Sequence, residues 1–78
     1  MEKEEFKRII AYQIYKRRMD KGWTQAELAE LANVSKSTIQ VYESRANIPT
    51  ALALYNIAEA FGCSMDELCG VAVGDKEG

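Results

Sequence analysis

Between positions 36 and 44, five side chains combine one cation, two hydroxyls, one amide and one small apolar group. These residues, which we call the reading face, are Lys36, Ser37, Gln40, Val41 and Ser44. Their groups match the edges of DNA bases: a lysine ammonium suits guanine, a glutamine amide suits adenine, a serine hydroxyl suits either, and an apolar group suits the thymine methyl. The alternative is a plain solvated helix face. Because no carboxylate is among the five, we favour base recognition.

A helical wheel separates the reading face from the apolar residues around it. Each residue of an α-helix turns by roughly 100°. If Lys36 is placed at 0°, the other four members fall between roughly 40° and 140°, whereas Ile39 and Tyr42 fall at roughly 300° and 240°. The pattern therefore predicts a helix that buries Ile39 and Tyr42 and presents the reading face.

The segment before this helix predicts a sharp joint. An earlier helix ends near Ala32 and the next begins near Lys36, so only Asn33, Val34 and Ser35 lie between them. So short a connection forces a steep angle, which is helix-turn-helix geometry. The turn needs a residue with positive φ, and asparagine is the best choice after glycine. We expect Val34 to fill the angle between the helices and Ser35 to cap the second one.

Two further helices are predicted before this joint. The first runs from about Glu4 to Asp20, and Gly22 marks its end. The second begins at Thr24, which forms a capping box with Glu27 three residues later. The apolar positions of the first helix are Phe6, Ile9, Ile10, Ile14 and Met19. The core positions expected from the second helix and the joint are Leu28, Leu31, Ala32 and Val34.

The last two predicted helices lie in the second half of the chain. The fourth follows Pro49, with Thr50 as its cap and Gly62 at its end. Its apolar residues, at helical spacing, are Leu54, Ile57, Ala58 and Phe61. The fifth begins with a second capping box, formed by Ser64 and Glu67. Because no strand pattern appears, the predicted fold class is all-α.

Charge is distributed unevenly along the chain. The formal net charge of the 78 residues is −2, which by itself argues against a nucleic-acid partner. Residues 1–46, however, carry nine Lys and Arg against seven Asp and Glu, and residues 47–78 carry one Lys against five Asp and Glu. Such a domain can present a basic face despite an acidic total. Ordinary surface scatter is the alternative.

Composition favours one small domain in a reducing compartment. No apolar run approaches the roughly 20 residues that span a membrane, and no secretory leader follows Met1, so we expect a cytoplasmic protein without a membrane segment. Cys63 and Cys69 are too few for a disulfide framework, and with no histidine in the chain they do not complete a zinc site. We expect both to be buried core thiols, and neither metal nor cofactor. No nucleophile–base pair or phosphate loop indicates an enzyme.

The stretch TQAELAELANVSKSTIQVYE resembles the helix-turn-helix of the Cro/C1 repressor family, also called the XRE family. The shared pattern is a Thr-Gln start, Leu-Ala in mid-helix, an Asn or Gly turn, Val-Ser, then Ser-Thr-Ile and a closing Glu. The resemblance extends through FGCSMDEL and covers about residues 10–69. It implies a five-helix, lambda-repressor-like DNA-binding domain, with residues 1–9 as an extension of the first helix and residues 70–78 as a tail.

The resemblance also implies roles for individual residues. In that family the glutamine that opens the second helix binds a DNA phosphate, which here is Gln25. Residues that open the recognition helix touch bases, here Lys36 and Ser37, and the position of Val41 faces the groove. Ser44 and Arg45 hold the backbone. The implied structural ion pair joins Arg18 and Glu43. Arg45 replaces the glycine of many members, which implies either a strained helix end or an added phosphate contact. The apolar residue that the family carries at Trp23 implies core packing there.

The implied function is a sequence-specific DNA-binding transcriptional regulator, most simply a repressor. It binds double-stranded DNA at a palindromic operator as a homodimer. We expect the dimer surface in the fifth helix and the tail, with Met65, Leu68, Val71 and Val73 as apolar contacts. The alternative is a protein-interaction module or an antitoxin-like partner protein with the same fold, which the acidic second half motivates. Tyr12, Tyr15 and Tyr55 are either packing or partner surface.

Overall fold

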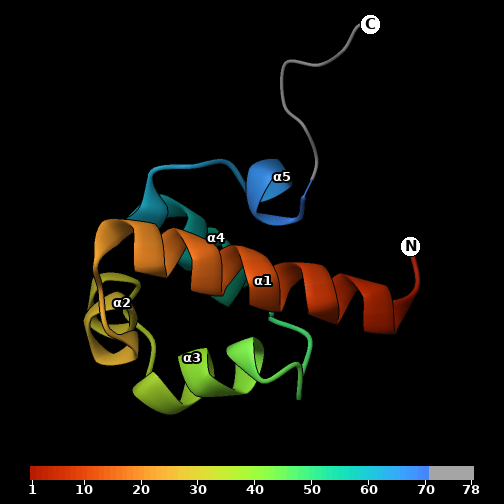
Figure 1. Cartoon of the computed structure of the whole chain (residues 1–78), viewed down its shortest axis with the longest axis horizontal. Coiled ribbons are helices and arrows are strands. Elements are labelled where there is room, and N and C mark those ends of the chain that lie inside the picture. Colours follow the sequence, from red (N-terminus) through yellow and green to blue (C-terminus); the bar gives the residue numbers. More distant parts are fainter. Residues whose placement is uncertain (71–78) are drawn as a thin grey trace, which may run out of the picture.

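The computed structural model describes residues 1–70 and contains five helices with no strand in that range (Figure 1). The helices are α1 (Lys3–Lys21), α2 (Gln25–Leu31), α3 (Lys36–Glu43), α4 (Ala51–Phe61) and α5 (Met65–Leu68). The predicted all-α class with five helices is therefore confirmed. Within this range no helix is long and apolar enough to cross a membrane.

The predicted helix starts are confirmed by their caps. The Thr24 hydroxyl accepts a hydrogen bond from the Glu27 amide at 3.0 Å, and the Glu27 carboxylate accepts one from the Thr24 amide at 2.7 Å. Ser64 and Glu67 form the same capping box at α5. Ser35 caps α3 through the amide of Thr38. Thr50 likewise caps α4. Each cap satisfies backbone donors that a helix leaves without a partner.

All five helices are followed by one residue in the left-handed region. These residues are Gly22 (φ 74°), Asn33 (φ 58°), Arg45 (φ 68°), Gly62 (φ 74°) and Gly70 (φ 86°). After α3, the Arg45 amide donates to the Tyr42 carbonyl and the Ala46 amide donates to the Val41 carbonyl, which is a Schellman motif. The positive φ predicted for Asn33 is confirmed, and Arg45 occupies a conformation that favours glycine.

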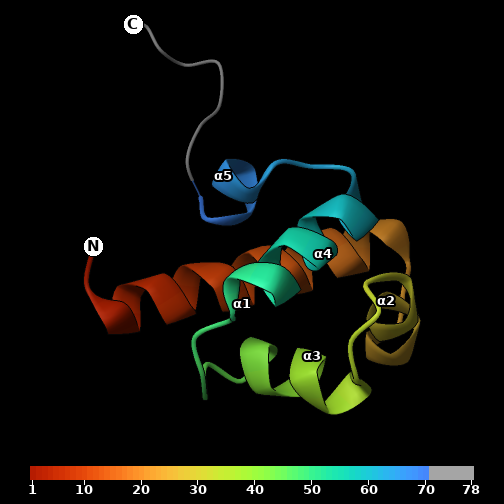
Figure 2. The ribbon, with the colours of Figure 1, turned by 180° about the vertical axis from the view of Figure 1, so that it is seen from behind.

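The core lies where α1 crosses the other four helices (Figures 1 and 2). Both views place α2 and α3 on one side of α1 and α5 on the other. The fully buried large side chains are Ile10, Ile14, Leu28, Ile39, Ile57 and Leu68. Because every helix contributes at least one of them, α3 is held to the rest of the molecule by the shared core.

The predicted burial of Leu31 is wrong, because Leu31 is 56% exposed. Met19, an apolar position of the first helix, is 52% exposed. Helix α2 packs inward through Leu28 and Ala32, one turn apart, and Leu31 lies outside that line. In α1 the buried line runs through Ile14 to Arg18, so Met19 turns outward.

The side chains of Trp23 and the two cysteines lie at the margin of the core. Trp23 is half-buried and stacks on Phe61 with ring centroids 5.8 Å apart. Cys63 and Cys69 are free thiols, half-buried against the core rather than fully buried, and that burial raises the pKa of each. The positions of Val71 and Val73, expected in the dimer surface, lie outside the described residues.

Candidate nucleic-acid interface

Helix α3 has two faces of opposite character. Ile39 and Tyr42 are buried at 0% and 8% exposure. Four members of the reading face are exposed and Val41 is half-buried. In Figure 1, α3 lies at the edge of the molecule, away from α5, with no helix on its outer side. The structure therefore brings the five reading-face residues together on one accessible surface, and their contacts with bases stay a prediction.

The turn between α2 and α3 sets the position of α3 relative to α2. The amide of Val34 donates to the carbonyl of Ala29 at 2.9 Å, which closes α2 and turns the chain. Val34 is half-buried and packs against the core, as expected for a residue that fills the angle between two helices. The positive φ of Asn33 makes this reversal possible within three residues.

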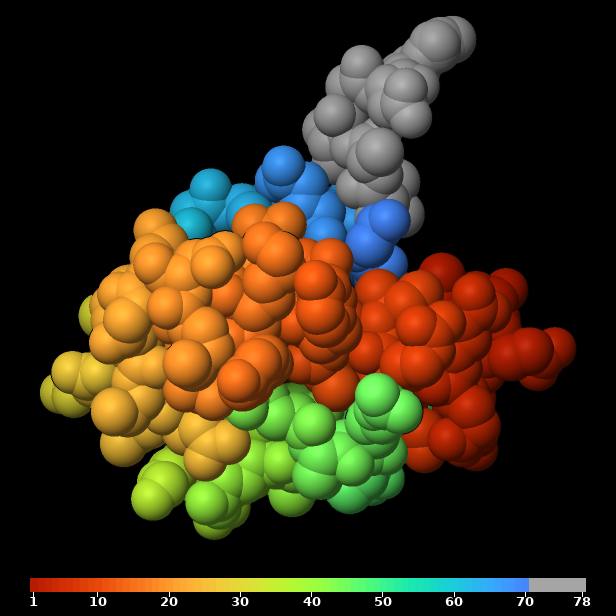
Figure 3. Space-filling view, viewed as in Figure 1, coloured from red at the N-terminus to blue at the C-terminus, as the bar shows by residue number. Residues whose placement is uncertain are grey.

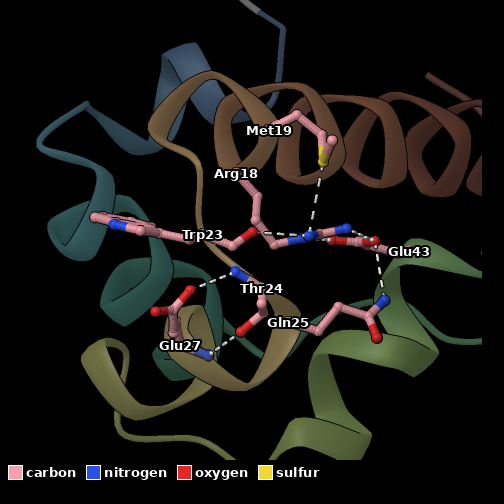
Figure 4. Close-up of polar contacts among 7 residues, drawn as sticks. All are labelled: Arg18, Met19, Trp23, Thr24, Gln25, Glu27 and Glu43. Atoms are coloured by element: carbon pink, nitrogen blue, oxygen red, sulfur yellow. Dashed lines mark hydrogen bonds and ion pairs between the residues drawn. The ribbon is translucent and has the colours of Figure 1, made fainter.

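A buried ion pair ties α1 to the last residue of α3 (Figure 4). The Arg18 guanidinium donates to both oxygens of Glu43, at 2.7 Å from Nε and 3.0 Å from Nη2. It also donates from Nη1 to the Trp23 carbonyl at 2.9 Å. The hydrogen bond to Glu43 raises the pKa of Arg18, against burial, which lowers it. The pair expected from the sequence is therefore present, and it anchors the end of α3.

Gln25 joins the same cluster from the first turn of α2 (Figure 4). Its Nε2 donates one hydrogen to Oε1 of Glu43 at 3.1 Å. An amide nitrogen carries two hydrogens, so the second is left for another acceptor. This half-buried side chain was predicted to bind a DNA phosphate, which stays a prediction, and the hydrogen bond to Glu43 orients its amide.

Ser44 and Arg45, at the end of α3, differ in the contacts that their side chains make. The Ser44 hydroxyl donates to the Val41 carbonyl at 2.8 Å, so its only hydrogen is used within the helix. In this arrangement Ser44 does not donate to a phosphate. Arg45 is exposed, and none of the ion pairs among residues 1–70 includes it.

Two hollows beside the reading face were not predicted from the sequence. Asn47 joins Ser37 and Val41 around a hollow of about 200 Å³. Tyr12 and Tyr15 of α1 form a second hollow of about 210 Å³ with the end of α3. The position of Asn47, a polar residue in the loop after α3, could have indicated the first hollow. Nothing in the sequence indicated the second one, because the neighbours of the two tyrosines lie about thirty residues away along the chain.

Comparison with known proteins identifies the class. A family model described as helix-turn-helix (HTH_3) matches residues 14–68. The match covers more than half of the chain, so this protein belongs to the HTH_3 helix-turn-helix family, and the resemblance drawn from the sequence is confirmed. The family and the fold are those of DNA-binding transcription regulators.

Individual relatives agree with this class. The chain is 43% identical over 47 residues to the cryptic phage CTXphi transcriptional repressor RstR of Vibrio cholerae. That match covers 60% of this chain and 42% of the repressor, so the chain spans less than half of that relative. An HTH_3 family transcriptional regulator from Vibrio cholerae superposes with a TM-score of 0.82 at 28% identity, covering 88% of this chain and 39% of the other. The hypothetical transcription factor NHTF from Neisseria shares the fold, with a TM-score of 0.80 at 22% identity over 88% of this chain and 79% of the other.

Proposed function

We propose that the chain is a sequence-specific DNA-binding transcriptional regulator that acts as a repressor and reads the major groove with α3. One observation carries this proposal: α3 presents five base-compatible side chains and no carboxylate on an accessible face, while its opposite face is locked into the core. A helix held in this way enters a groove without rearranging. The domain is residues 10–69, with residues 1–9 extending α1 and residues 70–78 as a tail, and the site of action is the cytoplasm.

Contacts divide into two kinds in this proposal. Lys36 and Ser37, in the first turn of α3, meet base edges, with Gln40 and Val41 one turn further along. Gln25 holds a phosphate with the hydrogen that Glu43 leaves free. Phosphate contacts set the register of the protein on the duplex, and base contacts choose the sequence. Repression follows when the bound protein occludes a promoter, and the relative named as a repressor supports that direction.

A palindromic operator and a homodimer complete the proposal. Helix α3 has eight residues and reaches few base pairs, so two copies are needed to select a site. The expected dimer contact through Leu68 is wrong, because Leu68 is 0% exposed and belongs to the protomer's own core. Half-buried Met65 stays a candidate. Leu52 of α4 is 70% exposed but lines a hollow with Ser35 and Thr38 at the start of α3, so we do not place it in the dimer surface. Figure 2 shows α5 and α3 on opposite sides of α1.

The test starts from duplexes enriched from a random pool by the wild-type protein. Lys36→Ala is expected to weaken binding by about 1–3 kcal/mol and to relax preference at one base position. Gln25→Ala is expected to weaken all sequences about equally. Lys21→Ala removes one charge at the end of α1, where the Lys21 ammonium lies 5.6 Å from the centroid of the Trp23 ring, and serves as the control. Equal scaling of every sequence by Lys36→Ala would remove Lys36 from base recognition, and no enrichment at all would refute the function.

A second function is supported by one observation. Residues 47–78 carry a net charge of −4, and this half exposes the apolar side chain of Leu52. A protein-interaction module, antitoxin-like or otherwise, would use that surface and bind DNA weakly. Salt distinguishes the two, because phosphate-driven binding weakens steeply with added salt and an apolar protein contact does not.

A further inference from the structure

A hollow between α4 and the start of α5 is not used by any contact assigned above. It encloses about 300 Å³, and the side chains that matter for its chemistry are Tyr55, Glu59, Cys63, Met65 and Asp66. We call it the α4–α5 hollow. In Figure 3 the blue surface of α5 lies on the edge of the molecule opposite the yellow-green surface of α3. A molecule bound beside α5 therefore lies on the side of the protein away from α3.

The walls of the α4–α5 hollow are apolar and accessible. Tyr55 is 50% exposed, which is high for a large aromatic side chain. Cys63 and Met65 are half-buried and pack against the core. Burial raises the pKa of the Cys63 thiol, so the thiol is uncharged near neutral pH and acts as part of the apolar wall. An aromatic ring beside a thioether suits the aliphatic stem of a long side chain.

Two carboxylates line the hollow beside these walls. Glu59 lies in α4 and Asp66 in α5, and both side chains are exposed. Neither takes part in any of the three ion pairs found within residues 1–70. No lysine or arginine of that range lines the hollow. The α4–α5 hollow therefore offers two negative charges that have no partner in the described part of the chain.

Two cations of α1 lie near the hollow but make other contacts. The charges of Arg17 and Lys21 act on the Cys63 thiol, against the effect of burial. The Arg17 guanidinium donates from Nε to the Gln13 side chain at 3.1 Å. The Lys21 ammonium lies 5.6 Å from the centroid of the Trp23 ring. Because neither cation is within ion-pair distance of the two carboxylates, the negative charge of the hollow stays open to a ligand.

Apolar walls and unpaired carboxylates together restrict the class of ligand. A DNA phosphate would be repelled by both carboxylates. A divalent metal ion needs several oxygen ligands, and within residues 1–70 no group of three or more ligating side chains is placed to hold one. An arginine or lysine fits both features, because its stem covers apolar surface while its charged head pairs with carboxylates.

We propose that the α4–α5 hollow binds an arginine or lysine from a basic segment of another protein. The stem of that side chain lies against Tyr55 and Met65, and its head pairs with Glu59 and Asp66. A second copy of this chain is not the favoured source of the cation, because a two-fold contact brings the same two carboxylates together.

The proposed ligand has a consequence for assembly. Met65 lines the hollow and is also the candidate dimer contact, so a basic segment bound there excludes the second copy. A partner of this chemistry therefore releases the protein from a palindrome without touching the reading face, and this consequence rests on the proposed function.

A pair of peptides tests the ligand class on the full chain without DNA. The probe is a short amphipathic peptide with leucines on one helical face and arginines on the other, and its twin carries citrulline at every arginine. Citrulline keeps the stem and removes the charge. Two ion pairs and a cation–π contact should make the arginine peptide bind about tenfold more tightly than its twin. Equal binding of the two peptides would overturn the proposal.

Removal of the carboxylates tests the site. Glu59→Gln and Asp66→Asn each remove one charge and keep the shape of the side chain. Each should weaken the arginine peptide about two- to fivefold, and the double variant about tenfold, with the citrulline peptide unaffected. Glu30→Gln, on an exposed part of α2, is the matched control and should bind as the wild type does. A double variant that binds as Glu30→Gln does would overturn the assignment of the hollow.

Removal of the aromatic wall is an independent test of the same site. Tyr55→Leu keeps an apolar side chain but loses the ring, and should weaken the arginine peptide about two- to fivefold. Tyr12→Leu changes a tyrosine of α1 that is 56% exposed and serves as the control. Backbone amides of α4 and α5 should show the largest chemical-shift changes when the arginine peptide is added. Changes centred on other helices, or equal losses in the two variants, would contradict the proposed site.

Competition on DNA tests the consequence for assembly. On a palindrome selected by the wild type, saturating arginine peptide should lower the affinity to that of a half-site, and the citrulline peptide should not. Binding to the half-site should stay unchanged, which controls for peptide bound to the DNA itself. The variant with both Glu59→Gln and Asp66→Asn should keep its affinity for the palindrome. Failure of the wild type to bind any duplex refutes the proposed function, whereas the peptide titrations without DNA decide the hollow.

Discussion

At the scale of single residues, the carboxylate of Glu43 joins three helices. It accepts hydrogen bonds from Arg18 of α1 and Gln25 of α2 while belonging to the last turn of α3. A buried ion pair is weak evidence of stability, because desolvation offsets much of the attraction. Its value here is positional, because the bonds fix the end of the reading helix and the amide of Gln25 together.

Removing one partner of this ion pair is therefore expected to lower the free energy of unfolding. Glu43→Ala leaves the Arg18 guanidinium, 8% exposed, without its counter-charge, and should lower the free energy of unfolding by about 3–5 kcal/mol. Urea denaturation measures this. The double variant Arg18→Met with Glu43→Leu removes both charges and should recover most of the loss. A single variant within about 0.5 kcal/mol of the wild type would show that the pair is not buried in solution.

Arg45 allows the opposite experiment on stability. Arg45→Gly removes a left-handed strain of about 1–2 kcal/mol and adds roughly half of that in unfolded-chain entropy, so a net gain of about 0.5–1 kcal/mol in the free energy of unfolding is expected. Asn33→Gly is the matched control, because asparagine tolerates this region and gains less. Thermal denaturation of both variants shows which of the two gains more stability. A loss of stability on Arg45→Gly would mean that the side chain, and not its conformation, dominates.

At the scale of elements, short helices depend on their ends. Helix α5 has four residues, and its capping box satisfies two backbone donors that its own hydrogen bonds leave free. The hydrogen bond from the Ser64 amide lowers the pKa of Glu67. A depressed carboxyl pKa stabilises the fold above the unfolded pKa of about 4.3 and ceases to do so as pH falls through the folded value.

That linkage gives a prediction specific to α5. Glu67→Gln keeps a side-chain acceptor but does not titrate, so its melting temperature should fall less than that of the wild type as pH drops from about 5 to about 3. Thermal unfolding at a series of pH values measures the difference. Glu59→Gln, on an exposed part of α4, is the control and should follow the wild type. Parallel curves for Glu67→Gln and the wild type would contradict the role of the capping box.

Features that depend on residues close together in the sequence could be predicted, and features that depend on distant residues could not. Helix starts at Thr24, Ser35 and Ser64 were predictable because a cap bonds to an amide three residues away. The turn at Asn33 was predictable for the same local reason. The buried face of α3 could be predicted too, because the apolar residues Ile39 and Tyr42 lie on the side of the helix away from the reading face.

Predictions failed where distant packing decides the outcome. Leu31 and Met19 are apolar at helical spacing, yet no other helix covers them. Leu68 was assigned to a dimer surface, but α5 turns it into the protomer core. The groove beside Arg45 depends on α1 and α3 lying together, which no local pattern reveals. Sequence spacing gives the face of a helix, and only the fold gives the neighbour that the face meets.

At the scale of the whole molecule, α3 and the candidate dimer residues lie in different regions. Helix α3 is on one side of α1 and α5 on the other (Figure 1). Met65 belongs to α5, and residues 47–78 are acidic whereas residues 1–46 are net positive. A contact between two copies through α5 therefore leaves both reading faces free for one side of a duplex.

The last prediction concerns that assembly. Two copies on a palindrome should place their recognition helices about 34 Å apart, one turn of DNA. The protomer's principal extents are 38, 25 and 21 Å, so two protomers side by side span this distance without rearrangement. Sedimentation with a full palindrome should give two protomers per duplex, and a half-site should bind one protomer more weakly. Met65→Glu places a carboxylate at the contact and should reduce the palindrome to half-site affinity, while circular dichroism shows the protomer still folded. Leu68→Ala is the contrasting variant: it opens a cavity in the core and should lower the free energy of unfolding by about 2–5 kcal/mol. One protomer per palindrome at saturation would refute the dimer, and wild-type assembly by Met65→Glu would place its surface elsewhere.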